Sequence, residues 1–485
     1  MTGWTTGVPL AVLVMLGLMV GCASSPRHAV PALSVPDSYR HSQGDDAPAG
    51  DDSVLGNAWW SVFNDPVLDA YQARAAQASP TLQAALARLG QARARQREQH
   101  AGRFLQVDAS FAPSRERPAA ATGDPAIGLW RAGLEVSYEV DLFGRIAAEA
   151  GAAQADAQQQ QALYRAALLA LQADVAQTYL LVRELDVDLA LRREALVLRE
   201  RSYRIAAHGQ AVGAYDELAV LRARTEWDAE QAAMFEAQRR RAMAEHALAA
   251  LLGHAPAGFR MAVRPSPWVE ISIPAGLPST LLARRPDIAA AERAMAAANA
   301  RVGVADAARF PRLSLTGAAG VQSTGLADLL QWSSRTFLLG SLTGGGLTLP
   351  MLDGGRRKAH LAHAQARYQE EVAHYRHVVL TAFNEVEDTL VHLRTLGDQR
   401  HAATAARHAA DRAAVLAGVQ YGEGALGQGD AIQAERTALE HRLAVARVEG
   451  ETARTTVQLI RALGGGWAAP APVLDASRRV EHPNN

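Results

Sequence analysis

Residues 152–208 contain neither glycine nor proline, and alanine is frequent among them. A continuous helix over this stretch would be about 86 Å long at ~1.5 Å per residue. No compact domain needs a helix of that length, because a small domain is only ~30 Å across. Such a helix needs lateral partners along its whole length, and alanine lets neighbouring helices approach closely. The stretch therefore predicts an elongated helical bundle.

The chain consists of two copies of one pattern. Two shifts superpose the copies, by 206 residues for the first part of the pattern (286 − 80) and by 211 for the rest (355 − 144). The superposed pairs include Pro286 on Pro80, Phe310 on Phe104, Gly355 on Gly144 and Gly464 on Gly253. The second copy thus has five extra residues between its two strands. Each copy predicts a helix, two strands, a very long helix, a turn and a long return helix.

Composition divides the chain into six predicted segments. They are a signal peptide (1–21), a tether rich in Pro, Ser, Asp and Gly (22–57), a first structural repeat (58–258), a linker (259–275), a second repeat (276–467) and a tail (468–485). The second long helix is expected from about Gly355 to Gly418, interrupted by Gly397.

Three segments alternate between apolar and polar residues, as strands with one apolar face do. In a fourth segment the alternation is poor, and the 211 shift sets its register by placing Leu347 on Val136 and Leu349 on Tyr138. The apolar positions are Leu105, Val107, Ala109 and Phe111; Trp130, Ala132, Leu134, Val136, Tyr138 and Val140; Leu313 and Leu315; and Leu347 and Leu349, the last two in a glycine-rich strand over roughly 338–350. The first two segments approach the ~9–11 residues that cross a bilayer as a tilted strand. Periodicity alone leaves open an ordinary half-buried sheet in a soluble protein.

Four strands are too few to close a barrel, since about eight is the smallest number that does so. Open strand edges are not tolerated in lipid. If the strands cross a membrane, several copies of the chain must share one barrel. The residues therefore require an oligomer without fixing the number of copies.

Other signals exclude several classes of function. The formal net charge of −1 gives no reason to expect a nucleic-acid partner. No catalytic nucleophile motif or spaced cysteine set is present, so neither an enzyme nor a cofactor is predicted. Histidines at His360, His363, His374 and His377 have a spacing that could hold a metal, but solvated helix surface is the simpler interpretation. No metal site is predicted.

The only cysteine, Cys22, ends the sequence Met19-Val20-Gly21-Cys22, which follows an apolar core at residues 8–20. This arrangement resembles the site at which bacterial lipoproteins are cleaved and lipidated, although no Lys or Arg precedes Arg27. Cys22 is therefore predicted to be the lipidated first residue of the mature protein. The alternative is an incidental cysteine in a discarded signal.

Several passages together resemble one protein family. They are GLPSTLLARRPDI at 276–288, RFPRLSLTG at 309–317, WWSVFNDPVLDA at 59–70, DLFGR at 141–145 and MLDGGRR at 351–357. The chain resembles the outer-membrane efflux lipoproteins of the NodT-type branch of the TolC-like outer membrane factors. That resemblance implies a mainly α-helical homotrimer with a shared 12-stranded transmembrane β-barrel and a long periplasmic helical barrel.

The same resemblance implies the partners and the location. The chain would be the passive exit duct of a three-part efflux system, beside a periplasmic adapter and an inner-membrane pump of RND type. It would be lipid-anchored in the outer membrane and extend into the periplasm. Alternatives are a duct for metal export or type I protein secretion, or a periplasm-bridging lipoprotein without a pore. A protein without a pore has no need for a strand that carries Glu135 and Glu139 on one face and Trp130 and Tyr138 on the other.

Two turns join the predicted hairpins, and the resemblance places them at the periplasmic entrance and at the adapter contact. The residues concerned are Gly213, Ala214, Tyr421, Glu423, Gly424, Ala425, Leu426 and Asp430. Asp430 resembles the acidic ring residue at the entrance of TolC-like proteins. A carboxylate favoured by the positive end of its helix is an equally good interpretation. Leu426 stands where some pump-linked members carry another acid.

Overall fold

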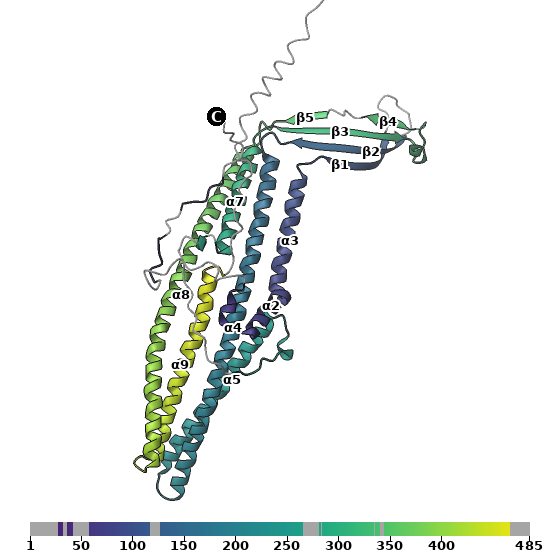
Figure 1. Ribbon diagram of the computed structural model, residues 1–485. Coiled ribbons are helices and arrows are strands. Elements are labelled where there is room, and N and C mark those ends of the chain that lie inside the picture. The colour runs from purple at the N-terminus through teal and green to yellow at the C-terminus, as the bar shows by residue number, and fades with distance from the viewer. Residues whose placement is uncertain are drawn as a thin grey trace, which may run out of the picture. The chain divides into compact units, whose positions relative to one another are not determined.

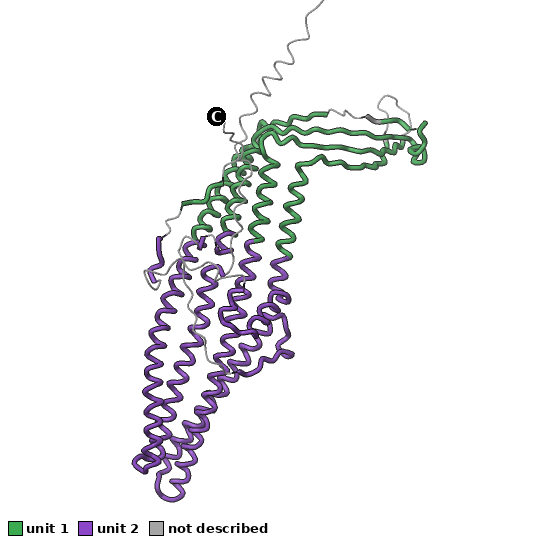
Figure 2. Tube along the Cα trace, in the orientation of Figure 1, with its two compact units in different colours: residues 1–33, 87–161, 290–377 green, residues 34–86, 162–289, 378–485 purple. Residues whose placement is uncertain are grey.

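The computed structural model describes residues 28–32, 36–41, 58–116, 127–264, 281–282, 284–333, 335–339 and 344–465. Cys22, the predicted signal peptide and the predicted tail lie outside the described residues. The chain separates into two compact units (Figure 2). Unit 1 comprises residues 1–33, 87–161 and 290–377, and unit 2 comprises residues 34–86, 162–289 and 378–485.

Unit 1 contains an antiparallel five-stranded sheet (Figure 1). Its strands are β1 (Gln106–Glu116), β2 (Ile127–Val140), β3 (Arg312–Ser323), β4 (Thr336–Leu339) and β5 (Gly344–Thr348). Strand β1 pairs with β2, β2 pairs with β3, and β3 pairs with both β4 and β5. Among the described residues, β1 therefore forms one edge of the sheet, while β4 and β5 together form the other.

The fourth strand was predicted as one segment over roughly 338–350, and here the structure differs. Leu339 of β4 lies opposite Ala319, whereas Gly344 of β5 lies opposite Thr316. Between these two pairs, the chain moves five residues from Leu339 to Gly344 but only three residues along β3, from Ala319 to Thr316. The two extra residues shift the register, which splits the predicted strand in two. The predicted alignment of Leu347 with Val136 is confirmed. Val136 lies opposite Val107 in the first copy, and Leu347 lies opposite Leu313 in the second. The 206 shift places Val107 on Leu313, so Val136 and Leu347 occupy equivalent positions.

The chain is mainly helical outside the sheet. The elements are η2 (Trp59–Phe63), α2 (Pro66–Ala78), α3 (Pro80–Ala101), α4 (Arg145–Ala211), α5 (Glu217–Leu251), η3 (Pro256–Gly258), α7 (Pro286–Ala307), η4 (Ala327–Leu330), α8 (Arg356–Gly422) and α9 (Gln428–Ala462). Helices α4 and α8 each have 67 residues, or about 100 Å at ~1.5 Å per residue. No helix of the described residues is both long enough and apolar enough to cross a membrane.

Both long helices run further than the sequence predicts. Helix α4 includes Gly151 and Gly209, which flank the predicted stretch, and α8 passes through Gly397 and Gly418. A glycine inside a helix costs only about 1 kcal/mol relative to alanine. That cost is small against the packing and hydrogen bonding of the many residues around it.

The core of unit 2 gathers where α2 meets the middle of α4 and the end of α5. Trp59, Tyr179 and Leu248 are fully buried there, together with Val457 from α9. Asp65 caps α2 by accepting a hydrogen bond from the Val67 N–H at 2.9 Å, and its second oxygen accepts one from the Tyr179 hydroxyl. Burial raises the pKa of the Tyr179 phenol, so the hydroxyl stays protonated and can donate.

Candidate functional site

The sheet of unit 1 has one apolar and one polar face. The register sets Val107 opposite Val136, Phe111 opposite Ala132 and Tyr138 opposite Leu315. Directly opposed residues of antiparallel strands lie on the same face, so the apolar positions of neighbouring strands coincide. Phe111 also stacks on Trp130, with the ring centroids 5.7 Å apart. The predicted apolar face is therefore continuous across β1, β2 and β3.

The other face carries polar and charged side chains. The Arg131 guanidinium donates to the Gln322 side-chain oxygen at 3.2 Å across β2 and β3. Glu135 lies opposite Asp108, and Glu139 receives two hydrogen bonds from Arg145 at the start of α4. This division of faces is what a strand needs when lipid lies on one side and water on the other.

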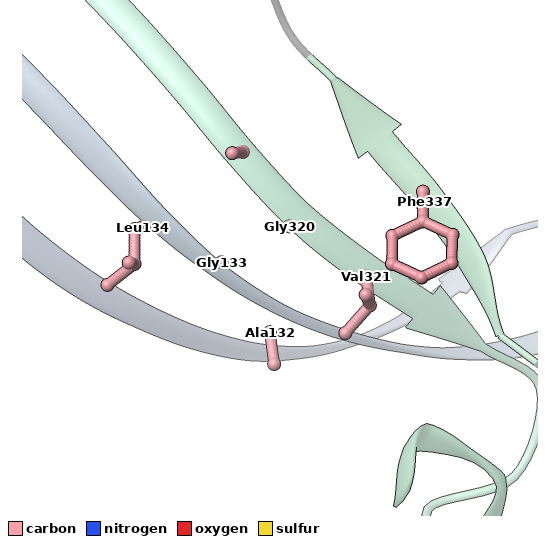
Figure 3. Close-up of a pocket in the computed structure, with 7 residues that line it drawn as sticks. Ala132, Gly133, Leu134, Gly320, Val321 and Phe337 are labelled. Carbon is pink, nitrogen blue, oxygen red and sulfur yellow. The ribbon is translucent and has the colours of Figure 1, made fainter. Parts of the chain in front are cut away.

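A shallow hollow of about 490 Å³ interrupts the apolar face. Figure 3 shows that its labelled residues come from β2, β3 and β4. The small side chains Ala132 and Ala319 lie between the larger Leu134, Val321 and Phe337. No polar side chain lines the hollow, so it belongs to the apolar face and holds none of the groups that catalysis would need.

The two hairpin turns in unit 2 have the same backbone geometry. Gly213 and Gly424 both have φ +76°, a conformation that costs other residues about 1–2 kcal/mol. Ala214 N–H donates to the carbonyl of Gly209 at 2.7 Å, and Ala425 N–H donates to the carbonyl of Gln420 at 2.8 Å. The helices before both turns therefore end in the same way.

The helices after the two turns begin differently. Asp216 caps α5 by accepting from the Ala219 N–H at 2.9 Å, whereas the N-cap residue of α9 is Gly427, which has no side chain to accept a hydrogen bond. Asp430 lies in the first turn of α9 with its side chain exposed. Of the other predicted tip residues, Gly213, Ala214, Tyr421, Glu423, Gly424 and Ala425 are exposed, and Leu426 is half-buried.

A layer of ion pairs, which the sequence reasoning missed, joins α4, α5 and α9. Glu226 of α5 accepts from Arg199 of α4 and from Arg436 of α9, both at 2.7 Å. Arg199 also lies 3.6 Å from Glu440. The side chains of Arg199 and Arg436 are both largely buried. The single carboxylate of Glu226 therefore balances the positive charges of two buried guanidinium groups. No local spacing signals this layer in the sequence, because Arg199 and Arg436 lie 27 and 210 residues from Glu226.

A second set of charges ties the chain after α5 to the first hairpin. Asp186, fully buried on α4, accepts from Arg241 at 2.7 Å and from the Arg264 N–H at 3.0 Å. Arg241 also pairs with Glu245, which accepts from the Met261 N–H. These bonds fix residues 259–264, the described part of the predicted linker.

The four histidines whose spacing could hold a metal lie along α8. His360, His363, His374 and His377 are all exposed on α8. Within the described residues, no three side chains of the metal-binding types come together.

The chain belongs to the outer membrane efflux protein family, whose model matches residues 72–254 and 277–465. These two stretches correspond to the two internal copies. The fold is that of the TolC-like outer-membrane channels, and the protein is an exit duct for efflux at the outer membrane. Its family is one of channel proteins. The narrower assignment to the NodT-type branch stays a prediction.

Relatives match over nearly the whole chain. Outer membrane protein OprJ of Pseudomonas aeruginosa is 34% identical, over 94% of this chain and 95% of OprJ. The solvent efflux pump outer membrane protein SrpC of Pseudomonas putida is 31% identical, over 95% and 98%. The cation efflux system protein CusC of Escherichia coli is 29% identical, over 93% and 96%.

Solved structures agree with this assignment. The Campylobacter jejuni CmeC outer membrane channel superposes with a TM-score of 0.84 at 26% identity, covering 92% of this chain and 96% of CmeC. The open state of the Neisseria gonorrhoeae MtrE outer membrane channel gives a TM-score of 0.78 at 28% identity, covering 92% and 98%.

Proposed function

We propose that three copies of the chain form the outer-membrane duct of a tripartite efflux system, with a periplasmic adapter and an inner-membrane pump of RND type as partners. The observation that carries this proposal is the two-faced sheet with an open edge on each side. Such a sheet cannot satisfy its backbone groups in lipid alone, and its polar face suits a water-filled lumen. Transport through the duct is passive, and the pump supplies the energy.

The transported substrates are small molecules selected by the pump. Proteins similar to this chain are named for the efflux of solvents, of toluene, of antibiotics and of cations. One duct architecture thus serves several cargo classes. The described residues hold no cluster that would favour metal cargo over organic cargo.

The N-terminal segment supports membrane attachment in this proposal. Cys22 is the lipidated first residue, and residues 22–57 connect it to the folded part. The described residues of this segment do not hang free, because Tyr39 is buried and the Arg40 N–H donates to the Glu387 carboxylate at 2.8 Å. Two or more acyl chains anchor a protein stably, where one gives only marginal binding. Cys22→Ala should abolish incorporation of labelled palmitate and weaken attachment, while the protein still assembles. A variant that failed to fold would contradict the role of residues 22–57 as a tether.

The first test is the mass of the purified full-length protein by light scattering, with the detergent contribution subtracted, followed by conductance in planar bilayers. A trimer that conducts supports the duct. A stable monomer without conductance would favour a periplasm-bridging lipoprotein.

Asp430 is proposed to form an acidic ring at the periplasmic entrance. Asp430→Asn removes one negative charge per chain, and the resting channel should then conduct more and select less for cations. Asp398→Asn, at an exposed position on α8 remote from the turn, is the matched charge control. Unchanged conductance and selectivity, with a lower melting temperature, would leave Asp430 as a helix-start residue.

A further inference from the structure

The two edges of the sheet in unit 1 expose both backbone and apolar side chains. Among the described residues, β1 pairs only with β2, and β5 pairs only with β3. Phe111 on β1 is 57% exposed, and on the other edge Leu347 and Leu349 are 59% and 51% exposed. An unpaired edge of this kind is a template for another strand. In lipid the pairing becomes obligatory.

The internal duplication predicts strand registers, and one of them can be checked within the chain. The 206 shift carries β1 onto β3, and the 211 shift carries β2 onto β5. In the first copy Ser110 lies opposite Gly133. The shifts carry this pair to Thr316 and Gly344, which lie opposite each other in the second copy. Shifts read from sequence identities therefore reproduce an observed register.

The ladder between β2 and β3 joins the first copy to the second. Val136 lies opposite Gly317 there, and Tyr138 lies opposite Leu315. In a closed ring of chains, the first and second internal repeats alternate. The second repeat of each chain must therefore also pair with a first repeat, and that repeat belongs to the next chain. The same two shifts then carry Val136 to Leu347 and Tyr138 to Leu349. They carry Gly317 back to Phe111 and Leu315 back to Ala109.

We propose that β5 and the residue after it, Leu349, pair antiparallel with β1 of a second copy, with Leu347 opposite Phe111 and Leu349 opposite Ala109. This register rests on the proposed oligomeric duct and defines its contact between subunits. In this register, apolar residues lie opposite apolar residues on the apolar face of the sheet. On the other face it sets Thr348 opposite Ser110, so two hydroxyl side chains meet across the interface.

Two prolines bound the ladder. The register sets Pro113 opposite Gly345 and Pro350 opposite Asp108. Proline has no N–H to donate, so the uninterrupted part lies between these pairs. It comprises residues 346–349 of one chain and 109–112 of the other, in which every residue carries an N–H.

Disulfide cross-linking between introduced cysteines tests the register. Ser110→Cys combined with Thr348→Cys places two thiols directly opposite each other. These positions lie on opposite edges of one chain's sheet, with β2 and β3 between them, so a bond between them joins two chains. Phe111→Cys with Leu347→Cys supplies a second direct pair. Adjacent pairs alternate in separation, and a disulfide needs Cβ atoms about 3.5–4.5 Å apart.

The matched control is Ala112→Cys with Thr348→Cys, which would face each other only if the register slipped by two residues. The single variants and the unmodified protein, which retains Cys22, measure background. After oxidation of isolated membranes, non-reducing gels should show covalent dimers and trimers for at least one direct pair. The yield should be several-fold above that of the control pair. No species larger than the closed ring should form.

The outcomes separate the register from the function. Stronger linking of the control pair would overturn the register while leaving the duct intact. An oligomer in detergent in which neither direct pair links would also overturn it. A protein that is monomeric in detergent and links in no combination would overturn the proposed duct itself.

Discussion

Gly464 lies so close to Arg284 that a β carbon on the glycine would be 2.8 Å from the arginine carbonyl oxygen. The first copy contains the same contact, since a β carbon on Gly253 would lie 2.7 Å from the carbonyl oxygen of Ala78. Both glycines follow the end of a return helix, with φ +91° and +72°. The duplication therefore extends to backbone packing, because each return helix ends against the residues just before the helix that leads into the strands of its own copy, α3 or α7.

We expect Gly464→Ala to destabilise the protein for two reasons. The left-handed backbone alone costs about 1–2 kcal/mol for a residue with a side chain. The contact with Arg284 adds to that cost, since a backbone carbonyl cannot move aside freely. Thermal unfolding of the solubilised protein measures the change. Gly354→Ala is the control, because Gly354 has φ +64° but no atom within 4 Å of a built β carbon. An equal loss in both variants would show that the contact contributes nothing.

Gly450→Ala should also destabilise, although glycine in a helix is normally replaced by alanine with a gain. A β carbon there would lie 2.7 Å from Cγ of Glu184, whose carboxylate pairs with Arg454. Glu184 is buried, so displacing it disturbs the packing of α4 against α9. Gly418→Ala, with free space around it on α8, should stabilise by up to about 1 kcal/mol. Differential scanning calorimetry on both variants decides whether the two changes have opposite signs.

Glu226→Gln should loosen the ion-pair layer between α4, α5 and α9. The change removes the negative charge between Arg199 and Arg436 and leaves two largely buried arginines facing each other. Because Glu226 itself is half-exposed, we expect a modest loss of about 1 kcal/mol. Glu236→Gln is the control, since Glu236 pairs with the exposed Arg239 on its own helix. A melting temperature that falls equally in both variants would argue against a special role for the layer.

We expect the contribution of Glu449 to the stability of the folded protein to depend on pH. Burial raises the pKa of its carboxyl, while Arg407 and Arg400 oppose the shift. The folded protein therefore binds this proton more tightly than the unfolded chain, so its contribution to stability falls as pH rises from the unfolded pKa to the folded pKa. Glu449→Gln should be more stable than the parent at pH 7. Below about pH 4 the difference should vanish, because the carboxyl is then protonated in both states. A gain that is independent of pH would exclude this cause.

The fold could largely be predicted because its signals are local and occur twice. The helical stretch at 152–208, the alternation around Phe111 and the coincidence of Gly464 with Gly253 each depend on neighbouring residues or on the repeat. The register of Leu347 followed from the shift alone. The split of the fourth strand could not be predicted, because the run Gly344–Gly346 gives no alternation that would fix its register.

The charged layer was harder to foresee. Glu226 and Arg436 are 210 residues apart and meet only after two hairpins have packed together. Asp186 and Arg241 likewise belong to different helices, and in the sequence they look like ordinary surface charges. Their pairing depends on helix rotation, which the sequence pattern leaves undetermined. Cys22 and the oligomeric entrance around Asp430 stay predictions.

The offset between β4 and β5 limits how such a chain can change in length. Of the five extra residues of the second copy, two lie between β4 and β5, and the other three lie between β3 and β4. An even insertion inside a strand restores the original facing of every later side chain, whereas an odd one reverses it. Here an odd insertion would turn Leu347 and Leu349 towards water. In evolution, therefore, an odd insertion between β4 and β5 needs a β-bulge to absorb it, whereas the turn between β3 and β4 accepts odd changes, as its three extra residues show.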